Sequence, residues 1–368
     1  MKKPRLFLLT LLLVIASVLS ACSGGGSAAT SWPGLTVSTD LKTAYVAYNQ
    51  QVFAIDLANG SEKWRYPQQA NNKITFFAPP ALTENGQLIV GGYNNLLYSL
   101  NAENGQPTQG SWPFAGATNR YIASPLAIGS TIFAPNGDEK IYAVSLDGKE
   151  QWLYKTQQPL WATPAVSPDG QTIYQPSMDH HIYALNAGNG QLVWKTEDLG
   201  GAIVGTPTLG SDGRLYVGTF AHEMLALDTK DGKVIWKKAT DGWVWAGPAL
   251  VENKLYFGDL MGVFYALNAS DGSQIWKTEP ETGSTSGISD RPLVIQGTIY
   301  FSSENGDLYA VDAAKGSVTW NKTIGGKLYG APVQAGNLIL VAPVGADSLV
   351  YAVDANGNQQ WTFKPAKK

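Results

Sequence analysis

The chain has 368 residues and a formal net charge of −3, and only 15% of its residues are charged. It carries no basic run that could track a phosphate backbone, which argues against a nucleic-acid partner. The chain has one cysteine, which excludes an internal disulfide. Its 40 glycines, 12 tryptophans and 17 tyrosines are typical of many short strands joined by tight turns.

The first 21 residues predict a secretory signal peptide. Lys2, Lys3 and Arg5 form a positive start, and an apolar run from Leu6 to Leu19 is short for a membrane span. Cys22 follows Leu19-Ser20-Ala21, which resembles a bacterial lipobox, so we expect cleavage before Cys22 and lipidation of that residue. The alternative is an ordinary secretory signal followed by an incidental cysteine.

Residues 22–31 are rich in Gly, Ser and Ala and predict a flexible tether between the lipid and the folded part. Several acyl chains on Cys22 would anchor the chain to a membrane, where one chain would not suffice. We therefore expect an extracytoplasmic, lipid-anchored protein. Ser23 after the cysteine favours the outer membrane if the host has one.

A repeat of about 42 residues fills residues 32–368, the predicted folded domain. Each copy has an aromatic or Leu residue, a turn ending in Gly, and a Trp, as in Tyr183…Gly190…Trp194. The eight Trp residues of this line are Trp64, Trp112, Trp152, Trp194, Trp236, Trp276, Trp320 and Trp361. The copy that ends at Trp112 has three extra residues between its Gly and its Trp.

Each copy also begins with a proline and contains four short apolar runs that alternate with turn residues. This pattern predicts four antiparallel strands per copy, with the proline at the start of the first, where its missing N–H is not needed. Eight such units predict an all-β, eight-bladed β-propeller that is a monomeric ring. Closure by packing of the last blade on the first, and closure by an added edge strand from near Trp32, both remain open.

The repeated Trp predicts a packing role between blades. Its ring is large enough to cover the turn of a neighbouring blade, and its indole N–H can reach a backbone carbonyl there. Removal of one such ring should cost about 3–5 kcal/mol if it is buried.

The pattern Tyr-Ala-Leu-Asp-x-x-x-Gly-x-x-x-Trp after x-Pro-x-Leu resembles the repeat of pyrroloquinoline-quinone-type (PQQ-like) propellers over nearly the whole mature chain. Together with the lipobox, it is similar to the lipoprotein subunits of the outer-membrane β-barrel assembly machine. The resemblance implies a non-enzymatic scaffold that binds a protein partner in the cell envelope. The family's partner-binding pattern Leu-Arg-Gly-x-Ser-x-Pro is absent, however, and Arg291 is the pre-proline Arg in a different context.

Quinone-dependent dehydrogenases share this repeat, and many of them use adjacent cysteines and calcium at the cofactor. Cys22 is the only cysteine here and lies in the leader motif. We therefore expect no PQQ, calcium or other metal cofactor and no catalytic residues.

The stretch before each proline predicts a binding surface. Four Trp residues fall outside the repeat line, and all four lie in these stretches: Trp32, Trp161, Trp243 and Trp245. The predicted binding mouth at one end of the channel consists of Phe77, Tyr121, Trp161, Trp243, Trp245, Arg291 and Tyr329. Aromatic residues dominate binding hot spots, but packing between blades would account for the same pattern.

Two weaker signals lie in the loops between the second and third strands. These loops are rich in acidic and amide residues such as Asp138, Asp179 and Asp259, which could attract a cation or a basic partner, or could serve ordinary turn chemistry. His180 and His222 hold equivalent places in adjacent copies, but their spacing is weak support for a metal site.

The sequence thus favours a lipid-anchored, non-enzymatic propeller that binds an envelope protein, in outer-membrane protein assembly if the resemblance holds. Two alternatives stand beside it. One is a quinone- and calcium-dependent enzyme, and the other is a surface receptor for a glycan or other small ligand.

Overall fold

The computed structural model describes residues 31–279 and 286–366. The predicted signal peptide, Cys22 and most of the predicted tether therefore lie outside the described residues. Residues 32–368 form one compact unit. Every element in its described part is a β-strand, and this part has no helix long and apolar enough to span a membrane.

The strands group into eight sheets in chain order, which we call blades 1 to 8. Blade 1 contains β1 (Gly34–Val37), β2 (Thr43–Tyr48), β3 (Gln51–Asp56) and β4 (Glu62–Tyr66). Blade 2 contains β5 (Ala81–Leu82), β6 (Gln87–Gly91) and β7 (Leu97–Asn101). Blade 3 contains β8 (Leu126–Ile128), β9 (Thr131–Pro135), β10 (Lys140–Ser145) and β11 (Glu150–Lys155). Blade 4 contains β12 (Ala165–Val166), β13 (Thr172–Pro176), β14 (Ile182–Asn186) and β15 (Leu192–Lys195).

The second half of the chain repeats this arrangement. Blade 5 contains β16 (Thr208–Leu209), β17 (Arg214–Thr219), β18 (Glu223–Asp228) and β19 (Val234–Ala239). Blade 6 contains β20 (Ala249–Val251), β21 (Lys254–Gly258), β22 (Phe264–Asn268) and β23 (Gln274–Thr278). Blade 7 contains β24 (Leu293–Ile295), β25 (Thr298–Ser302), β26 (Asp307–Asp312) and β27 (Val318–Thr323). Blade 8 contains β28 (Val333–Ala335), β29 (Leu338–Val341), β30 (Val350–Val353) and β31 (Gln359–Phe363).

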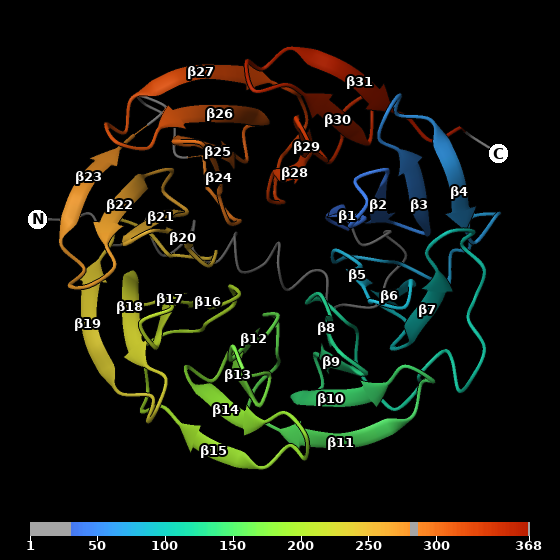
Figure 1. Ribbon diagram of the computed structural model, residues 1–368, viewed down its shortest axis with the longest axis horizontal. Helices are drawn as coiled ribbons and strands as arrows, with labels where there is room; N and C mark the ends of the chain where they lie inside the picture. Colours follow the sequence, from blue (N-terminus) through green and yellow to red (C-terminus); the bar gives the residue numbers. More distant parts are fainter. Residues whose placement is uncertain (1–30, 280–285, 367–368) are drawn as a thin grey trace, which may run out of the picture. The chain divides into compact units, whose positions relative to one another are not determined.

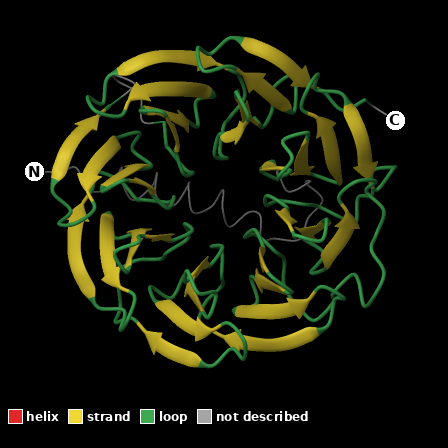
Figure 2. Ribbon diagram, viewed as in Figure 1, coloured by secondary structure: helices red, strands yellow, loops and turns green. Residues whose placement is uncertain are grey.

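The eight blades form a closed ring around a central channel, which confirms the predicted eight-bladed propeller (Figure 1). The first strand of each blade lies nearest the channel, and the last lies at the circumference. Figure 2 shows that only loops join the strands. All pairings within the blades are antiparallel, and successive strands pair with each other, for example β1 with β2 and β2 with β3.

Blade 2 departs from the predicted four strands, because its sheet has three. The chain after β7 forms only isolated bridges to it, Leu100 with Pro107 and Leu97 with Phe114. Between these bridges the backbone bulges toward blade 3, where the N–H of Ser111 donates to the carbonyl of Asp147 at 2.7 Å. The extra residues before Trp112 thus form this bulge.

The repeated Trp residues occupy one recurrent environment. In seven blades the Trp lies opposite an Ala on the third strand, as in Ala184 and Trp194, and the register shifts directly after this Ala. The small Ala side chain leaves room for the ring beside it.

All eight indole N–H groups donate to a backbone carbonyl of the next blade, at 2.9–3.1 Å. The acceptors, in the order of the Trp residues along the chain, are Ala102, Leu146, Ala187, Thr229, Ala269, Ala313, Ala355 and Leu57. Each ring also covers the turn glycine there. At Gly232, for example, an added Cβ would lie 2.7 Å from the ring of Trp194, and φ is +73°. Of the eight rings, only Trp64 is buried, at 7% exposure, and the others are half-buried, so they contribute less apolar burial than a core ring would.

Packing of blade 8 on blade 1 closes the ring. Trp361 on β31 donates to the carbonyl of Leu57, which follows β3. The same contact zone holds one core cluster with residues of both blades, including Val46, Phe53, Leu340 and Val350. Within the described chain, all strands of blade 8 come from its C-terminal end, so no N-terminal strand is added to it.

Candidate functional site: the aromatic mouth

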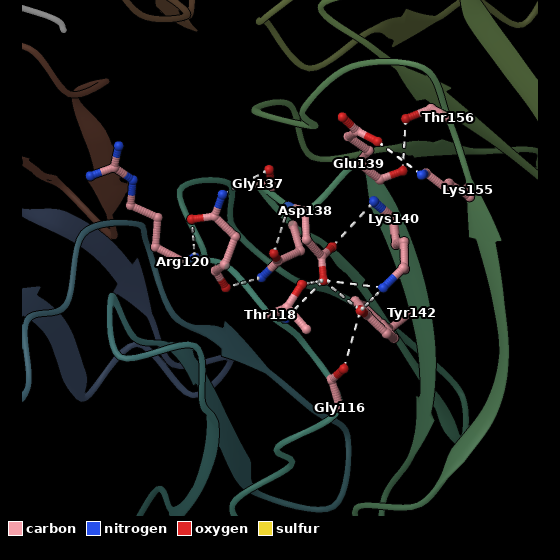
Figure 3. A network of polar contacts seen from close by, with 12 residues as sticks. Gly116, Thr118, Arg120, Gly137, Asp138, Glu139, Lys140, Tyr142, Lys155 and Thr156 are labelled. Atoms are coloured by element: carbon pink, nitrogen blue, oxygen red, sulfur yellow. Dashed lines mark hydrogen bonds and ion pairs between the residues drawn. The ribbon is translucent and has the colours of Figure 1, made fainter. Parts of the chain in front are cut away.

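Two sets of loops meet on one face of the ring. One set precedes the first strand of each blade, and the other joins the second and third strands. In blade 3, Asp138 of the second set accepts hydrogen bonds from the backbone N–H and the hydroxyl of Thr118 in the first set, at 2.9 and 3.1 Å (Figure 3).

Asp138 is held within its own loop network. Its carboxylate also accepts from the Tyr142 hydroxyl at 2.6 Å and lies 3.6 Å from the Lys140 ammonium. Burial is the main cause that raises the pKa of Tyr142, and the hydrogen bond to Asp138 adds to it. In Figure 3 the side chain of Arg120 points away from this network.

Blades 4 and 6 have the same type of contact between a loop carboxylate, a Tyr hydroxyl and the preceding loop. Asp179 accepts from the Tyr183 hydroxyl at 2.7 Å and from a backbone N–H of the preceding loop. Asp259 accepts from the Tyr265 hydroxyl at 2.9 Å and from the backbone N–H of Gly242 at 2.8 Å. These carboxylates therefore hold the two loop sets together. Asp259 also accepts from the backbone N–H groups of Met261 and Val263 in its own turn, at 2.9 and 3.0 Å, which is the turn chemistry that the sequence offered as the alternative to cation binding.

The three histidines have separate partners. A ring nitrogen of His180 lies 3.1 Å from the Asp198 carboxylate, that of His181 lies 2.9 Å from the Thr196 carbonyl, and that of His222 lies 3.3 Å from the Asp241 carbonyl. Among residues 31–279 and 286–366, no group of three or more His, Cys, Asp or Glu side chains is placed to hold a metal ion.

Aromatic rings from three blades converge on Trp32 at the mouth of the channel. Trp32 stacks on Tyr329 of the loop before blade 8, with ring centroids 4.5 Å apart and an interplanar angle of 10°. It also contacts Phe77 before blade 2 at 5.3 Å and Trp245 before blade 6 at 5.8 Å. All four rings are half-buried. We call these four residues the aromatic mouth.

Further rings extend the aromatic mouth on both sides. Phe77 stacks on Tyr93, with the Arg120 guanidinium 5.3 Å from the Tyr93 ring centroid. On the other side, Phe220 contacts Trp245 at 5.4 Å and stacks on Trp243 at 4.8 Å. The result is a continuous series of rings from blade 2 to blades 5 and 6.

Comparisons with known proteins are consistent with this fold. A family model described as "Outer membrane protein assembly factor BamB" matches residues 48–197, 178–295 and 260–368, which together cover most of the chain. The chain belongs to the BamB family. The predicted PQQ-like, BamB-like relationship is thereby confirmed.

Individual relatives of this BamB-family chain are distant. The outer membrane protein assembly factor BamB of Shewanella oneidensis is 25% identical over 154 residues, which are 39% of this chain and 38% of that protein. The crystal structure of BamB from Moraxella catarrhalis has a TM-score of 0.69 at 17% identity and covers 84% of this chain and 92% of its own. The computationally designed Ika8 protein has a TM-score of 0.72 at 11% identity, covering 91% and 96%. The two structures show a shared fold.

The predicted mouth residues fall into different environments in this BamB-family chain. Phe77, Trp245 and Tyr329 lie in the aromatic mouth, and Trp243 lies in its extension. Tyr121 does not reach it: the residue is 1% exposed and packs in the core beside β6 and β9. Trp161 is half-buried and makes no ring contact with the cluster within the described residues.

Arg291, in the loop before blade 7, is half-buried, and its guanidinium is engaged by backbone and side-chain partners. Its guanidinium donates to the carbonyl of Pro248 at 3.1 Å and to the hydroxyl of Thr208, which joins the loops before blades 7 and 6 to β16. Burial lowers the pKa of Arg291, and the neighbouring Asp290 opposes that shift. Arg291 therefore links blade 7 to blades 5 and 6 by hydrogen bonds.

Tyr121 lies in the core because side chains alternate between core and mouth along the loop before each proline. Four residues before each of the seven repeat prolines that follow Pro33 the side chain is buried, and these core residues are Phe76, Tyr121, Leu160, Ile203, Val244, Ile288 and Leu328. Three residues before the proline stand Phe77, Trp245 and Tyr329 of the mouth. In an extended loop, neighbouring side chains point to opposite sides. Tyr121 lies four residues before its proline, which is the core position, so counting the offset from the proline predicts that Tyr121 is buried.

Sequence reasoning missed Tyr93 and Phe220 and gave Trp32 no place in the predicted mouth. Tyr93 and Phe220 each lie two residues before a residue with positive φ, Asn95 and His222, in the loop between the second and third strands. An alignment of these loops on that position would have shown two aromatic residues at one offset. The proximity of Trp32 had no such signal, because it depends on how the ring closes.

Proposed function

We propose that this chain is a non-enzymatic, lipid-anchored scaffold of the cell envelope that binds a protein partner during outer-membrane protein assembly. Membership of the BamB family supports the process, and the predicted lipobox at Cys22 supports the location. The observation that carries partner binding is the aromatic mouth, where half-buried rings from the loops before four blades meet on one face.

The aromatic mouth has the character of a protein-binding hot spot. Tyr and Trp rings contribute large contact areas at low cost in side-chain entropy. The Asp259 carboxylate accepts from the backbone N–H of Gly242 at 2.8 Å and so helps to fix the loop before blade 6, which carries Trp245. A rigid apolar centre with a polar surround suits a protein surface.

We expect no quinone at this mouth. A flat cofactor in the channel would have to share the entrance with the indole of Trp32, which already contacts Phe77, Trp245 and Tyr329. Incubation with pyrroloquinoline quinone and calcium should leave the melting temperature unchanged, since tight binding to the folded state would raise it.

The test of the scaffold proposal is affinity capture of the full-length lipoprotein from its own envelope. The wild type should retain a component of the β-barrel assembly machinery, identified by mass spectrometry, and Trp243→Ala with Trp245→Ala should lose it. Trp161→Ala is the matched control, because Trp161 also precedes a proline and is half-buried but lies outside the cluster. Equal capture by all three proteins would show that the aromatic mouth is not the docking surface.

A further inference from the structure

The position of Trp32 differs from that of the eight repeated Trp residues. Each repeated indole N–H donates to a carbonyl of the next blade, whereas the indole N–H of Trp32 has no hydrogen-bond partner among the described residues. The backbone of Trp32 likewise makes no hydrogen bond in this part of the chain. The structure shows the Trp32 side chain held by ring contacts with Phe77, Trp245 and Tyr329.

Trp32 also precedes the first strand, because β1 begins at Gly34. Its movement would therefore break no pairing between β1 and β2, which starts at Gly34 with Ala47. A half-buried indole at this point of the chain is easier to release than any Trp of the repeat line. Release of a repeated Trp would break its hydrogen bond to the next blade and remove its ring from the turn glycine there.

In the other seven blades, the residue directly before the proline is either small or held by hydrogen bonds. In the other blades this position holds Pro79, Ser124, Thr163, Thr206, Gly247, Arg291 and Ala331. Arg291 is bound to Pro248 and Thr208, and Thr163 donates to the Ser124 carbonyl at 2.9 Å. Trp32 is thus the one large side chain here that is held by ring contacts.

Phe77, Trp245 and Tyr329 come from separate loops, and each contacts Trp32, while within the described chain none of the three has a ring contact with another. They define a site shaped around one aromatic ring, with a parallel face at Tyr329 and tilted faces at the other two. Such a site suits an indole or phenol ring, because aromatic pairs favour stacked and tilted arrangements at these distances.

We propose that Phe77, Trp245 and Tyr329 form a binding site for an aromatic side chain of a partner polypeptide, and that Trp32 occupies this site in cis until such a side chain replaces it. The inference rests on the proposed function and names the chemistry of the partner. Because Trp32 competes, the apparent affinity for an outside ring is reduced by the fraction of time that Trp32 is in place.

The experiment measures binding of N-acetyl-tryptophanamide to the full-length protein in detergent by calorimetry. Trp32→Ala should bind this probe about tenfold or more tighter than the wild type, because the competitor is gone. N-acetyl-leucinamide, which has no ring, should gain little. A second change, Tyr329→Ala in the Trp32→Ala background, should abolish the gain, and Trp161→Ala alone should match the wild type.

Near-ultraviolet circular dichroism and the melting transition establish that each variant is folded, and Trp32→Leu replaces Trp32→Ala if the latter is not. A folded variant that binds the probe no better than the wild type overturns the proposal, as does an equal gain for the leucine probe. Probe binding without capture of any assembly component would leave the aromatic site standing and contradict the scaffold function. Capture of an assembly component that depends on Trp245, without any probe binding, would support the scaffold function and contradict the aromatic site.

Discussion

The indole N–H of Trp361 donates to the carbonyl of Leu57 at 3.0 Å, across 304 residues of sequence. The same contact at 2.9–3.1 Å joins each of the other seven pairs of neighbouring blades. The junction between the two ends of the propeller is therefore built like every other junction in the ring.

Trp361→Phe tests this junction directly, because it keeps a ring and removes the N–H donor. The Leu57 carbonyl loses its side-chain partner, so the free energy of unfolding should fall by about 1–2 kcal/mol. Trp194→Phe, which removes the equivalent bond to Thr229 inside the ring, should cost the same amount within error in urea denaturation. A loss at Trp194 with none at Trp361 would mean that the ends are not joined as described.

Gly232 and Gly213 form a matched pair for the role of the Trp cover. Both have positive φ, +73° and +76°, but a Cβ at Gly232 would lie 2.7 Å from the Trp194 ring, whereas the nearest atom at Gly213 is 3.6 Å away. Gly213→Ala should cost about 1 kcal/mol of backbone strain. Gly232→Ala must also displace the indole and should cost about 2–4 kcal/mol. Similar losses in thermal unfolding would contradict the packing role of Trp194.

His180 occupies a left-handed backbone conformation, with φ at +71°, at a position where blades 6 and 7 have Gly262 and Gly306. His180→Gly and His180→Ala both remove the contact with Asp198, so they differ only in backbone strain. We expect the Gly variant to be more stable than the Ala variant by about 1 kcal/mol. At Val318, in the extended strand β27, the order should reverse. The same order at both sites would show that strain at His180 is absent.

Tyr216 predicts a dependence of stability on alkaline pH. Burial, aided by the Asp212 charge, raises the pKa of this residue from 10.0 to about 12. Because the folded-state pKa is the higher one, the stability contribution is complete below about pH 10 and is lost as the pH rises toward 12. Urea denaturation of wild type and Tyr216→Phe across this range should show a shallower decline in the variant. Phe257→Leu, which removes no titrating group, should shift the whole curve without changing its slope.

The repeat by itself determined the ring. Each copy contains its own strands, its turn glycine and its Trp, and the indole N–H of that Trp bonds to the next copy, so a periodic sequence specifies a periodic structure. The alternation before each proline also separates the core position, as at Tyr121, from the mouth position, as at Phe77, once the offset is counted.

Only the tertiary structure decided which of the remaining residues meet. Trp161 and Trp245 hold the same place relative to their prolines, yet only Trp245 reaches Trp32. Phe77, Trp245 and Tyr329 are brought to Trp32 because closure of the ring places blades 1, 2, 6 and 8 around one channel entrance. These contacts join residues far apart in sequence through side chains outside the repeat, and no local pattern encodes such a meeting.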